Sequence, residues 1–259
     1  MCPRQAGPEP LNPARSKART LKGAIGVAYV VVHEIRFPGE SESYRTARDE
    51  LLRAEIELRR HTEDVAAQRR ALPAGGAIPT DYVFDEGSTR DEEVRPVRLS
   101  ELFGDGSETL MLYSFMYGPS TEAACPLCTS FIDAIDGELE HINQRLAFAV
   151  VARSPIERLR EHARSRGWRR ARLLSSSANT FNADYHAEGA DGEQYPLAHV
   201  FARRDGVVRH AYTTELLFAP ADAGQSPRHI DSMWPLWNVF DLTPQGRGQD
   251  WWPQLHYPQ

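Results

Sequence analysis

The sequence predicts an α/β fold in which helices cover both faces of a central mixed sheet, preceded by a long helix and a hairpin. Residues 109–116 and 146–151 are near-continuous apolar runs, as expected of strands that are buried on both faces. The stretch between them has helical spacing, so the three segments form a strand, helix, strand unit. Further on, Arg204-Asp205-Gly206 separates two apolar runs, which indicates a second hairpin.

Length and composition fit a globular protein. The 259 residues can form one large domain or two small ones, and 41% hydrophobic with 25% charged residues excludes a fibrous or fully disordered chain. The formal net charge is −6 and no block of Lys and Arg could follow a phosphate backbone, so we expect no nucleic-acid partner. Three cysteines cannot form a multi-disulfide framework, which favours a cytoplasmic protein.

The N-terminal residues 1–37 are expected to be a leader outside the fold, because organised patterning begins only after Pro38. The apolar stretch 24–32 is shorter than the roughly 20 residues that span a bilayer. It is also followed by His33-Glu34-Ile35-Arg36 instead of small residues typical of a cleavage site. We therefore expect no membrane association.

Next comes a helical extension, residues 38–78, and then the sheet domain, residues 79–259, which ends in an aromatic tail. Within the extension, the pattern of 43–71 predicts one long amphipathic helix with a strongly charged face. That charged face is expected to contact solvent, with a homodimer seam as the alternative. Residues 81–84 and 94–98 predict a hairpin in which Pro96 restricts the second strand to a sheet edge.

Helix-capping residues and helix breakers predict where the later elements begin and end. Residues 155–167 predict a helix with Ser154 as N-cap, Pro155 in its first position and Gly167 just past its end. A strand is expected at 171–174, and apolar spacing over 228–240 predicts a closing helix that is broken at Pro235.

The main chemical motif is Cys125-Pro126-Leu127-Cys128, which follows the first apolar strand and opens the next helix. Unpaired N–H groups and the macrodipole at a helix N-terminus favour a thiolate, so Cys125 is the expected nucleophile. Cys128 lies one turn later and is the expected resolving thiol. Pro126 is compatible with this position because no intrahelical hydrogen bond is needed from its nitrogen.

Two other interpretations of the cysteine pair remain open. It could be half of a structural zinc site, but no second C-x-x-C or H-x-x-x-H pair is present in the sequence. It could also be a buried pair without chemistry, because free cysteine packs as a small hydrophobic residue. We expect neither a metal nor an organic cofactor.

Histidines and tryptophans are secondary candidates. His186, His199 and His210 could move protons near the dithiol, although a single histidine in a strand is more often structural. The tail tryptophans could line an apolar ligand pocket or could dock the tail onto its own domain; they are Trp234, Trp237, Trp251 and Trp252.

Several separated stretches resemble the bacterial domain-of-unknown-function 899 family, a thioredoxin-like branch related to peroxiredoxins. They are 44–72, Cys125 to Cys128, Gly167-Trp168, Ser175-Ser176, 181–185, 200–203 and 241–247. The resemblance implies a thioredoxin-like three-layer sandwich but no assigned reaction. The basic run Arg169-Arg170-Ala171-Arg172 and the stretch 215–231 depart from the family pattern.

The resemblance also guides the expected surroundings of the dithiol. Thioredoxins place a cis-proline beside it, just before a strand, and Pro196 is the candidate here. We expect Pro126, Pro196, Tyr117 and His199 to support the two cysteines.

The resulting hypothesis is a thiol-disulfide oxidoreductase that cycles Cys125 and Cys128 against an unidentified thiol or disulfide protein or small molecule. A peroxidase variant would oxidise Cys125 to a sulfenic acid, and the preceding Pro119-Ser120-Thr121 fits a peroxiredoxin site only loosely. The alternative is a non-catalytic protein that binds a small ligand or a partner on the same scaffold.

Overall fold

The computed structural model describes residues 20–22, 28–30, 33–104, 106–248 and 250–258, which fall into two compact units, Met1–Ala71 and Leu72–Gln259. Most of the expected leader, residues 1–37, lies outside the described residues. Within it, β1 (Thr20–Lys22) and β2 (Ala28–Val30) pair in antiparallel fashion.

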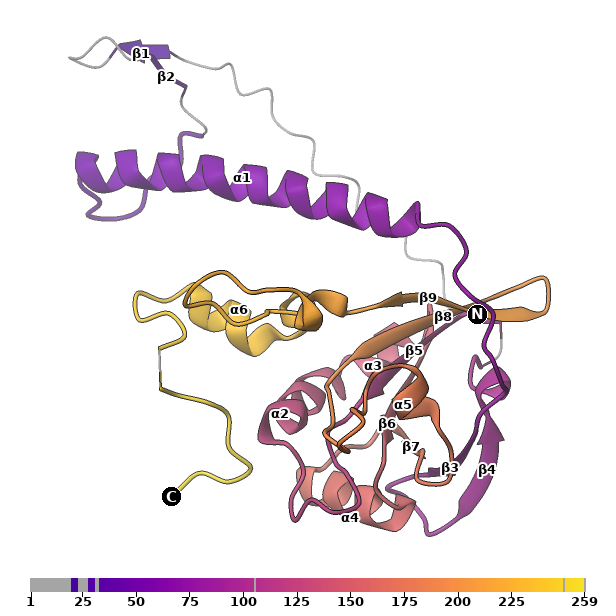
Figure 1. Cartoon of the computed structure of the whole chain (residues 1–259). Helices are drawn as coiled ribbons and strands as arrows, with labels where there is room; N and C mark the ends of the chain where they lie inside the picture. Colours follow the sequence, from indigo (N-terminus) through magenta and orange to yellow (C-terminus); the bar gives the residue numbers. More distant parts are fainter. Residues whose placement is uncertain (1–19, 23–27, 31–32, 105, 249, 259) are drawn as a thin grey trace, which may run out of the picture. The chain divides into compact units, whose positions relative to one another are not determined.

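Helix α1 (Glu42–Arg70) contains most of the described residues of the first unit, and its single long span confirms the prediction for 43–71 (Figure 1). The Ser41 hydroxyl caps it by accepting the N–H of Tyr44 at 3.1 Å. Arg69 and Arg70 lie in the last turn, where positive charge complements the helix dipole.

The second unit is built on a seven-stranded mixed sheet with the order β4-β3-β7-β6-β5-β8-β9. Strands β5, β6 and β7 are parallel to one another, and every other neighbouring pair is antiparallel. The strands are β3 (Val83–Gly87), β4 (Val94–Arg98), β5 (Thr109–Ser114), β6 (Ala147–Ala152), β7 (Arg172–Ser175), β8 (Ala198–Arg204) and β9 (Val207–Thr213).

Both predicted hairpins are confirmed. Strand β4, which contains Pro96, is at the sheet edge, where the missing N–H of proline costs no ladder bond. Between β8 and β9, Asp205 and Gly206 have φ values of 53° and 75°, the left-handed conformation that a tight hairpin turn requires.

The sheet is covered on both faces, as predicted. One face packs against α2 (Pro126–Ile135), α3 (Leu139–Ile142), α4 (Ile156–Arg166) and α6 (Pro235–Asp241). The other packs against two short elements, the 3₁₀ turn η1 (Leu99–Glu101) and α5 (Phe181–Asp184). Strand β5 contributes Tyr113 to the first core and Leu112 to the second, so its buried residues alternate between the two layers.

Asp136 separates two helices where the spacing predicted one. Its carboxylate accepts three backbone N–H groups, from Arg169 at 3.0 Å and from Arg170 and Ala171 at 2.9 Å each. These bonds join the end of α2 to the residues that enter β7. The chain then turns at Gly137 before α3 begins.

Two predicted helix ends need correction. Pro155 itself occupies the N-cap position of α4, while the Ser154 hydroxyl donates to the Gly118 carbonyl at 3.4 Å, so Ser154 is not the cap. In the tail, Pro235 begins α6 instead of breaking it, because its fixed φ suits a first helical position. The predicted end of α4 is confirmed, with Gly167 in the left-handed conformation at φ 74°.

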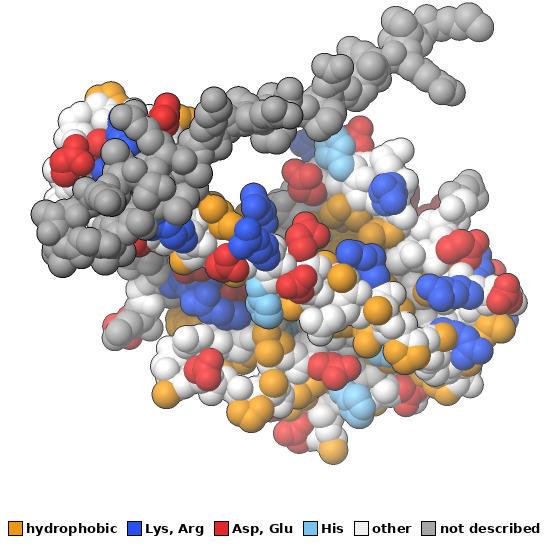
Figure 2. All heavy atoms as spheres, turned by 90° about the horizontal axis from the view of Figure 1, so that it is seen from above, with side chains coloured by type: hydrophobic (Ala, Val, Ile, Leu, Met, Phe, Trp, Pro, Cys, Tyr) orange, Lys and Arg blue, Asp and Glu red, His pale blue; other side chains and the backbone are white. Residues whose placement is uncertain are grey.

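Acidic and basic side chains are interspersed on the face of the molecule shown in Figure 2. Of the helices in the described part of the chain, none combines the length and the apolar character needed to cross a bilayer.

Candidate active site

The dithiol lies where the sequence predicts it, at the start of the helix that follows the buried strand β5. Cys125 is the N-cap of α2, with extended backbone angles, and Pro126 is the first helical residue. The N–H of Cys125 donates to the Met116 carbonyl at 3.1 Å, which fixes the end of the connecting loop. The first cysteine is therefore held beside the unpaired N–H groups of the helix.

The two thiols have opposite environments. Cys125 is partly exposed and Cys128 is only 1% exposed. A hydrogen bond from the Cys128 thiol is the main cause that lowers the pKa of Cys125 to about 6; burial opposes it, and the N–H groups of Cys128 and Leu127 assist it. Burial, followed by the neighbouring Cys125, raises the pKa of Cys128 well above its usual value. At neutral pH the geometry thus provides an accessible thiolate backed by a protonated thiol.

Tyr113 lies behind Cys128 on the α2 side of the sheet. Its ring centroid is 4.6 Å from that of Phe131, and its buried hydroxyl has no N or O partner among the described residues. Burial, and then interaction with the Cys128 thiol, raises the pKa of this hydroxyl well above its usual value. The Tyr113 hydroxyl therefore stays protonated beside the buried sulfur. The near-continuous apolar run of β5 carries no alternation that would have assigned residue 113 to this face.

Arg158 fixes the loop that leads to Cys125. From α4, its guanidinium donates to the carbonyls of Gly118 at 3.2 Å, Pro119 at 3.3 Å and Glu122 at 2.9 Å, and also to Thr121. The same group lies 4.3 Å above the ring of Tyr117, the predicted supporting residue, which is thus part of the loop's packing.

A second set of hydrogen bonds supports Cys125 from the beginning of α2. The Thr129 hydroxyl donates to the Cys125 carbonyl at 2.9 Å and lies 3.0 Å from Nε2 of His162. Burial, and then the charge of Arg166, lowers the pKa of His162 to about 4, so this imidazole is neutral at pH 7. His162 was not a sequence candidate, although it shares a helix face with buried Leu159 and Ala163.

Pro196 precedes β8. Its peptide bond is trans, so the prediction of a cis-proline at this position is wrong. The proline carbonyl accepts a hydrogen bond from Nε2 of His229 at 2.8 Å. The next carbonyl, of Leu197, accepts the N–H of Ser114 at 2.8 Å, which ties this segment to the end of β5.

His199 does not support the dithiol, contrary to expectation. Its ring contacts Phe181 and Tyr185 in the core on the other face of the sheet. Its Nδ1 lies 2.8 Å from the Thr213 hydroxyl and its Nε2 lies 3.2 Å from that of Ser114. The register places it there because successive strand residues point to opposite faces.

His210 and His186 also belong to that other face. Nε2 of His210 is 2.6 Å from the Thr213 hydroxyl, and both histidines line a cavity beside Tyr185. The structure therefore brings none of the three candidate histidines to the dithiol.

The aromatic tail mostly docks onto its own unit. Trp234 and Trp237 are 4% and 6% exposed and belong to the core under α2. Trp252 is 50% exposed, with its ring 5.7 Å from that of Trp237. Among the described residues, no group of three or more His, Cys, Asp or Glu could hold a metal ion.

A family model described as "Bacterial protein of unknown function (DUF899)" matches residues 35–257. The chain belongs to this family. No curated protein matches the sequence.

Similar solved structures include peroxiredoxins. The reduced 2-Cys peroxiredoxin of Plasmodium vivax is 16% identical, covering 62% of this chain and 81% of its own, with a TM-score of 0.42. Peroxidoxin BcpB of Mycobacterium tuberculosis is 17% identical over 63% and 95%, with a TM-score of 0.40. Peroxiredoxin Q of Xanthomonas campestris is 12% identical over 61% and 94%, with a TM-score of 0.41. The assignment of a thioredoxin-like fold stands on this chain's own strand order and on the helix that follows β5.

Proposed function

We propose that this protein is a thiol-disulfide oxidoreductase with Cys125 as nucleophile and Cys128 as resolving thiol. The observation that carries the proposal is the inequality of the two sulfurs. Cys125 is accessible at the N-terminus of α2 with a lowered pKa, whereas Cys128 is buried behind it. A pair with a purely structural role would not need one sulfur to be a partly exposed thiolate.

The reaction follows from this inequality. The Cys125 thiolate attacks one sulfur of a partner disulfide, forming a mixed disulfide and releasing the partner's other sulfur as a thiolate. Cys128 then loses its proton and attacks Cys125, which releases the second partner sulfur. The partner disulfide gains two electrons, one proton comes from Cys128 and the second from water, and Cys125 and Cys128 become a disulfide.

A peroxide could replace the partner disulfide at the same sulfur. Attack by the Cys125 thiolate would break the O–O bond, leaving a sulfenic acid and a hydroxide or alkoxide. Attack by Cys128 on the sulfenic sulfur would then release water and give the same disulfide. Arg158 supports this variant only indirectly, because its guanidinium is bound to loop carbonyls.

Alkylation tests the proposal directly. Peptide mass spectrometry would follow modification of each cysteine between pH 4 and 9, with a glutathione redox series on the same protein and Cys125→Ser and Cys128→Ser as controls. We expect Cys125 to react with an apparent pKa near 6, Cys128 to stay protected, and the pair to close reversibly. If both thiols react only after unfolding, the pair is structural and the proposal is wrong.

The proposal also includes a cellular compartment and a class of reaction partner. A reducing cytoplasm would regenerate the dithiol, and an unidentified thiol or disulfide protein or small molecule would be the substrate. If the alkylation result is negative, the alternative of a non-catalytic binding protein becomes the better interpretation.

A further inference from the structure

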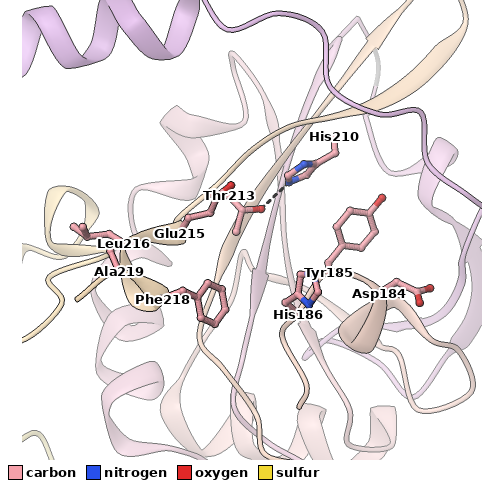
Figure 3. Close-up of a pocket in the computed structure, with 9 residues that line it drawn as sticks. All are labelled: Asp184, Tyr185, His186, His210, Thr213, Glu215, Leu216, Phe218 and Ala219. Carbon is pink, nitrogen blue, oxygen red and sulfur yellow. Dashed lines mark hydrogen bonds between the residues drawn. The ribbon is translucent and has the colours of Figure 1, made fainter. Parts of the chain in front are cut away.

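The face of the sheet opposite the dithiol has a cavity of about 850 Å³, a volume suited to a small organic molecule. One wall is the end of α5 and the turn after it, with Asp184, Tyr185 and His186. The other wall is the 3₁₀ turn η2 (Glu215–Phe218), and His210 from β9 closes the cavity between them (Figure 3). None of these residues takes part in the proposed thiol chemistry.

The cavity carries negative charge. Glu215 lies on the η2 wall, Asp184 lines the opposite wall with its carboxylate pointing away from η2 (Figure 3), and no Lys or Arg is among the described lining residues. Oδ2 of Asp184 accepts the hydroxyls of Tyr82 at 2.7 Å and Thr180 at 2.6 Å, which fixes this carboxylate without neutralising it. Neither acid forms an ion pair with a described Lys or Arg, so an anionic ligand would be repelled and a cation attracted.

Aromatic rings form much of the remaining wall. Tyr185 is held by Phe181 and Phe201, with ring centroids at 4.9 and 5.1 Å. Phe218 is half-exposed and backed by Tyr195 at 6.0 Å. The faces of such rings attract ammonium groups, and they also bury apolar carbon.

The hydrogen-bonded chain behind the cavity holds His210 in place. Its Nε2 bonds to the Thr213 hydroxyl at 2.6 Å, and that hydroxyl in turn lies 2.8 Å from Nδ1 of His199. Burial lowers the pKa of His210, which keeps the ring uncharged at neutral pH. His210 therefore adds no positive charge that would oppose a bound cation.

We propose that this cavity binds a small organic ammonium ion that carries an aromatic or similarly sized apolar group. Glu215 would pair with the ammonium, the charge of Asp184 would add attraction from behind the opposite wall, and Tyr185 and Phe218 would contact the apolar group and the face of the cation. The proposal is independent of the thiol reaction, because the cavity and the dithiol lie on opposite faces of the sheet.

A matched pair of probes tests the charge preference. Phenethylammonium and 3-phenylpropionate share a ring and a two-carbon linker but carry opposite charges. Calorimetric titration of the full chain should show at least about tenfold tighter binding of the ammonium. Equal affinities, or no binding of phenethylammonium up to about 10 mM, would overturn the proposal.

Three variants locate the binding. Glu215→Gln should weaken phenethylammonium binding about fivefold, and Phe218→Leu, which keeps an apolar side chain but removes the ring, about threefold. Glu157→Gln, an exposed change on α4 at the other face, is the matched control and should leave the affinity unchanged. If all three variants bind alike, the ammonium binds elsewhere and the proposed site is wrong.

Discussion

The two faces of the sheet carry different polar systems, although the same strand contributes to both. Tyr113 of β5 points toward α2 and the buried sulfur, while the next residue, Ser114, hydrogen-bonds His199 on the opposite face. The first face meets a helix N-terminus and the second meets a chain of hydroxyls and imidazoles. A one-residue step along a strand therefore separates two chemical environments.

The comparison shows that burial keeps both acids and bases uncharged. It raises the pKa of Cys128 and lowers the pKa of His199 to about 3, so both are neutral at pH 7. Cys125 differs because the Cys128 thiol and helix N–H groups bind its charged form. Of the two sulfurs, only the partly exposed one therefore carries negative charge at neutral pH.

The largest expected effect comes from removing that sulfur. Cys125→Ser should lower the rate of disulfide exchange about 100-fold or more, because a serine hydroxyl is not ionised at neutral pH. Phenethylammonium affinity should remain at the wild-type value, since the cavity is on the other face. Reduction of a glutathione disulfide, followed by thiol release, measures the rate. Retained exchange in this variant would assign the chemistry to another group.

Matched core substitutions test whether the two faces act separately. Phe131→Ala and Phe201→Ala each remove a fully buried ring, one from each core, and should lower the free energy of unfolding by about 3–5 kcal/mol. Only Phe131→Ala should increase native-state alkylation of Cys128, because Phe131 packs against Tyr113 behind that thiol. Equal alkylation in both variants would show that the faces are mechanically coupled.

Acidification should weaken the histidine face. The folded-state pKa of His199 lies near 3, below the ordinary value of 6.5, so the unfolded state binds more protons between these limits. The contribution of His199 to the free energy of unfolding is fully present above pH 6.5. It declines as the pH falls toward 3, by up to about 1.4 kcal/mol per pH unit. Urea unfolding at several pH values measures the slope, to which His162 adds in the same direction.

The variant His199→Gln isolates the contribution of His199, because glutamine does not titrate. Its unfolding free energy should fall less steeply below pH 6.5 than that of the wild type. An unchanged slope would mean that His199 is already exposed to protons in the folded protein.

The smallest expected effect concerns the buried tyrosine. Interaction with the Tyr113 hydroxyl favours the Cys128 thiolate, so Tyr113→Phe should slow closure of the disulfide a few-fold while leaving the alkylation of Cys125 unchanged. The change in stability should stay within about 1 kcal/mol, because the hydroxyl has no N or O partner among the described residues. Rapid-mixing kinetics of a preformed Cys125 mixed disulfide measure the closure step, and wild-type closure rates would exclude a role for this hydroxyl.

The sequence predicted the elements that depend on local patterns. The apolar runs of β5 and β6, the long α1, the hairpin turn at Asp205-Gly206 and the dithiol at the start of α2 all follow from periodicity or from special backbone angles. Pro96 was also correctly assigned to an edge.

The surroundings of the dithiol could not be predicted in the same way. Arg158 and His162 reach the site through tertiary contacts from α4, more than 30 positions along the chain, and no local pattern encodes such contacts. The prediction for His199 was wrong because the face that a buried strand residue occupies depends on the strand register. A strand that is buried on both faces shows no alternation of apolar and polar residues from which that face could be inferred.

The link between Asp136 and residues 169–171 has a consequence for sequence change. One carboxylate holds three consecutive residues by their main-chain N–H groups, so the side chains of Arg169 and Arg170 are not what positions the entry to β7. Natural variation can therefore alter the charge and size of these two side chains without displacing the strand, provided that none of the three donors becomes a proline. Asp136 has no such freedom. The bond pattern thus gives this part of the chain two positions, 169 and 170, whose side chains can vary, and one residue, Asp136, that anchors them.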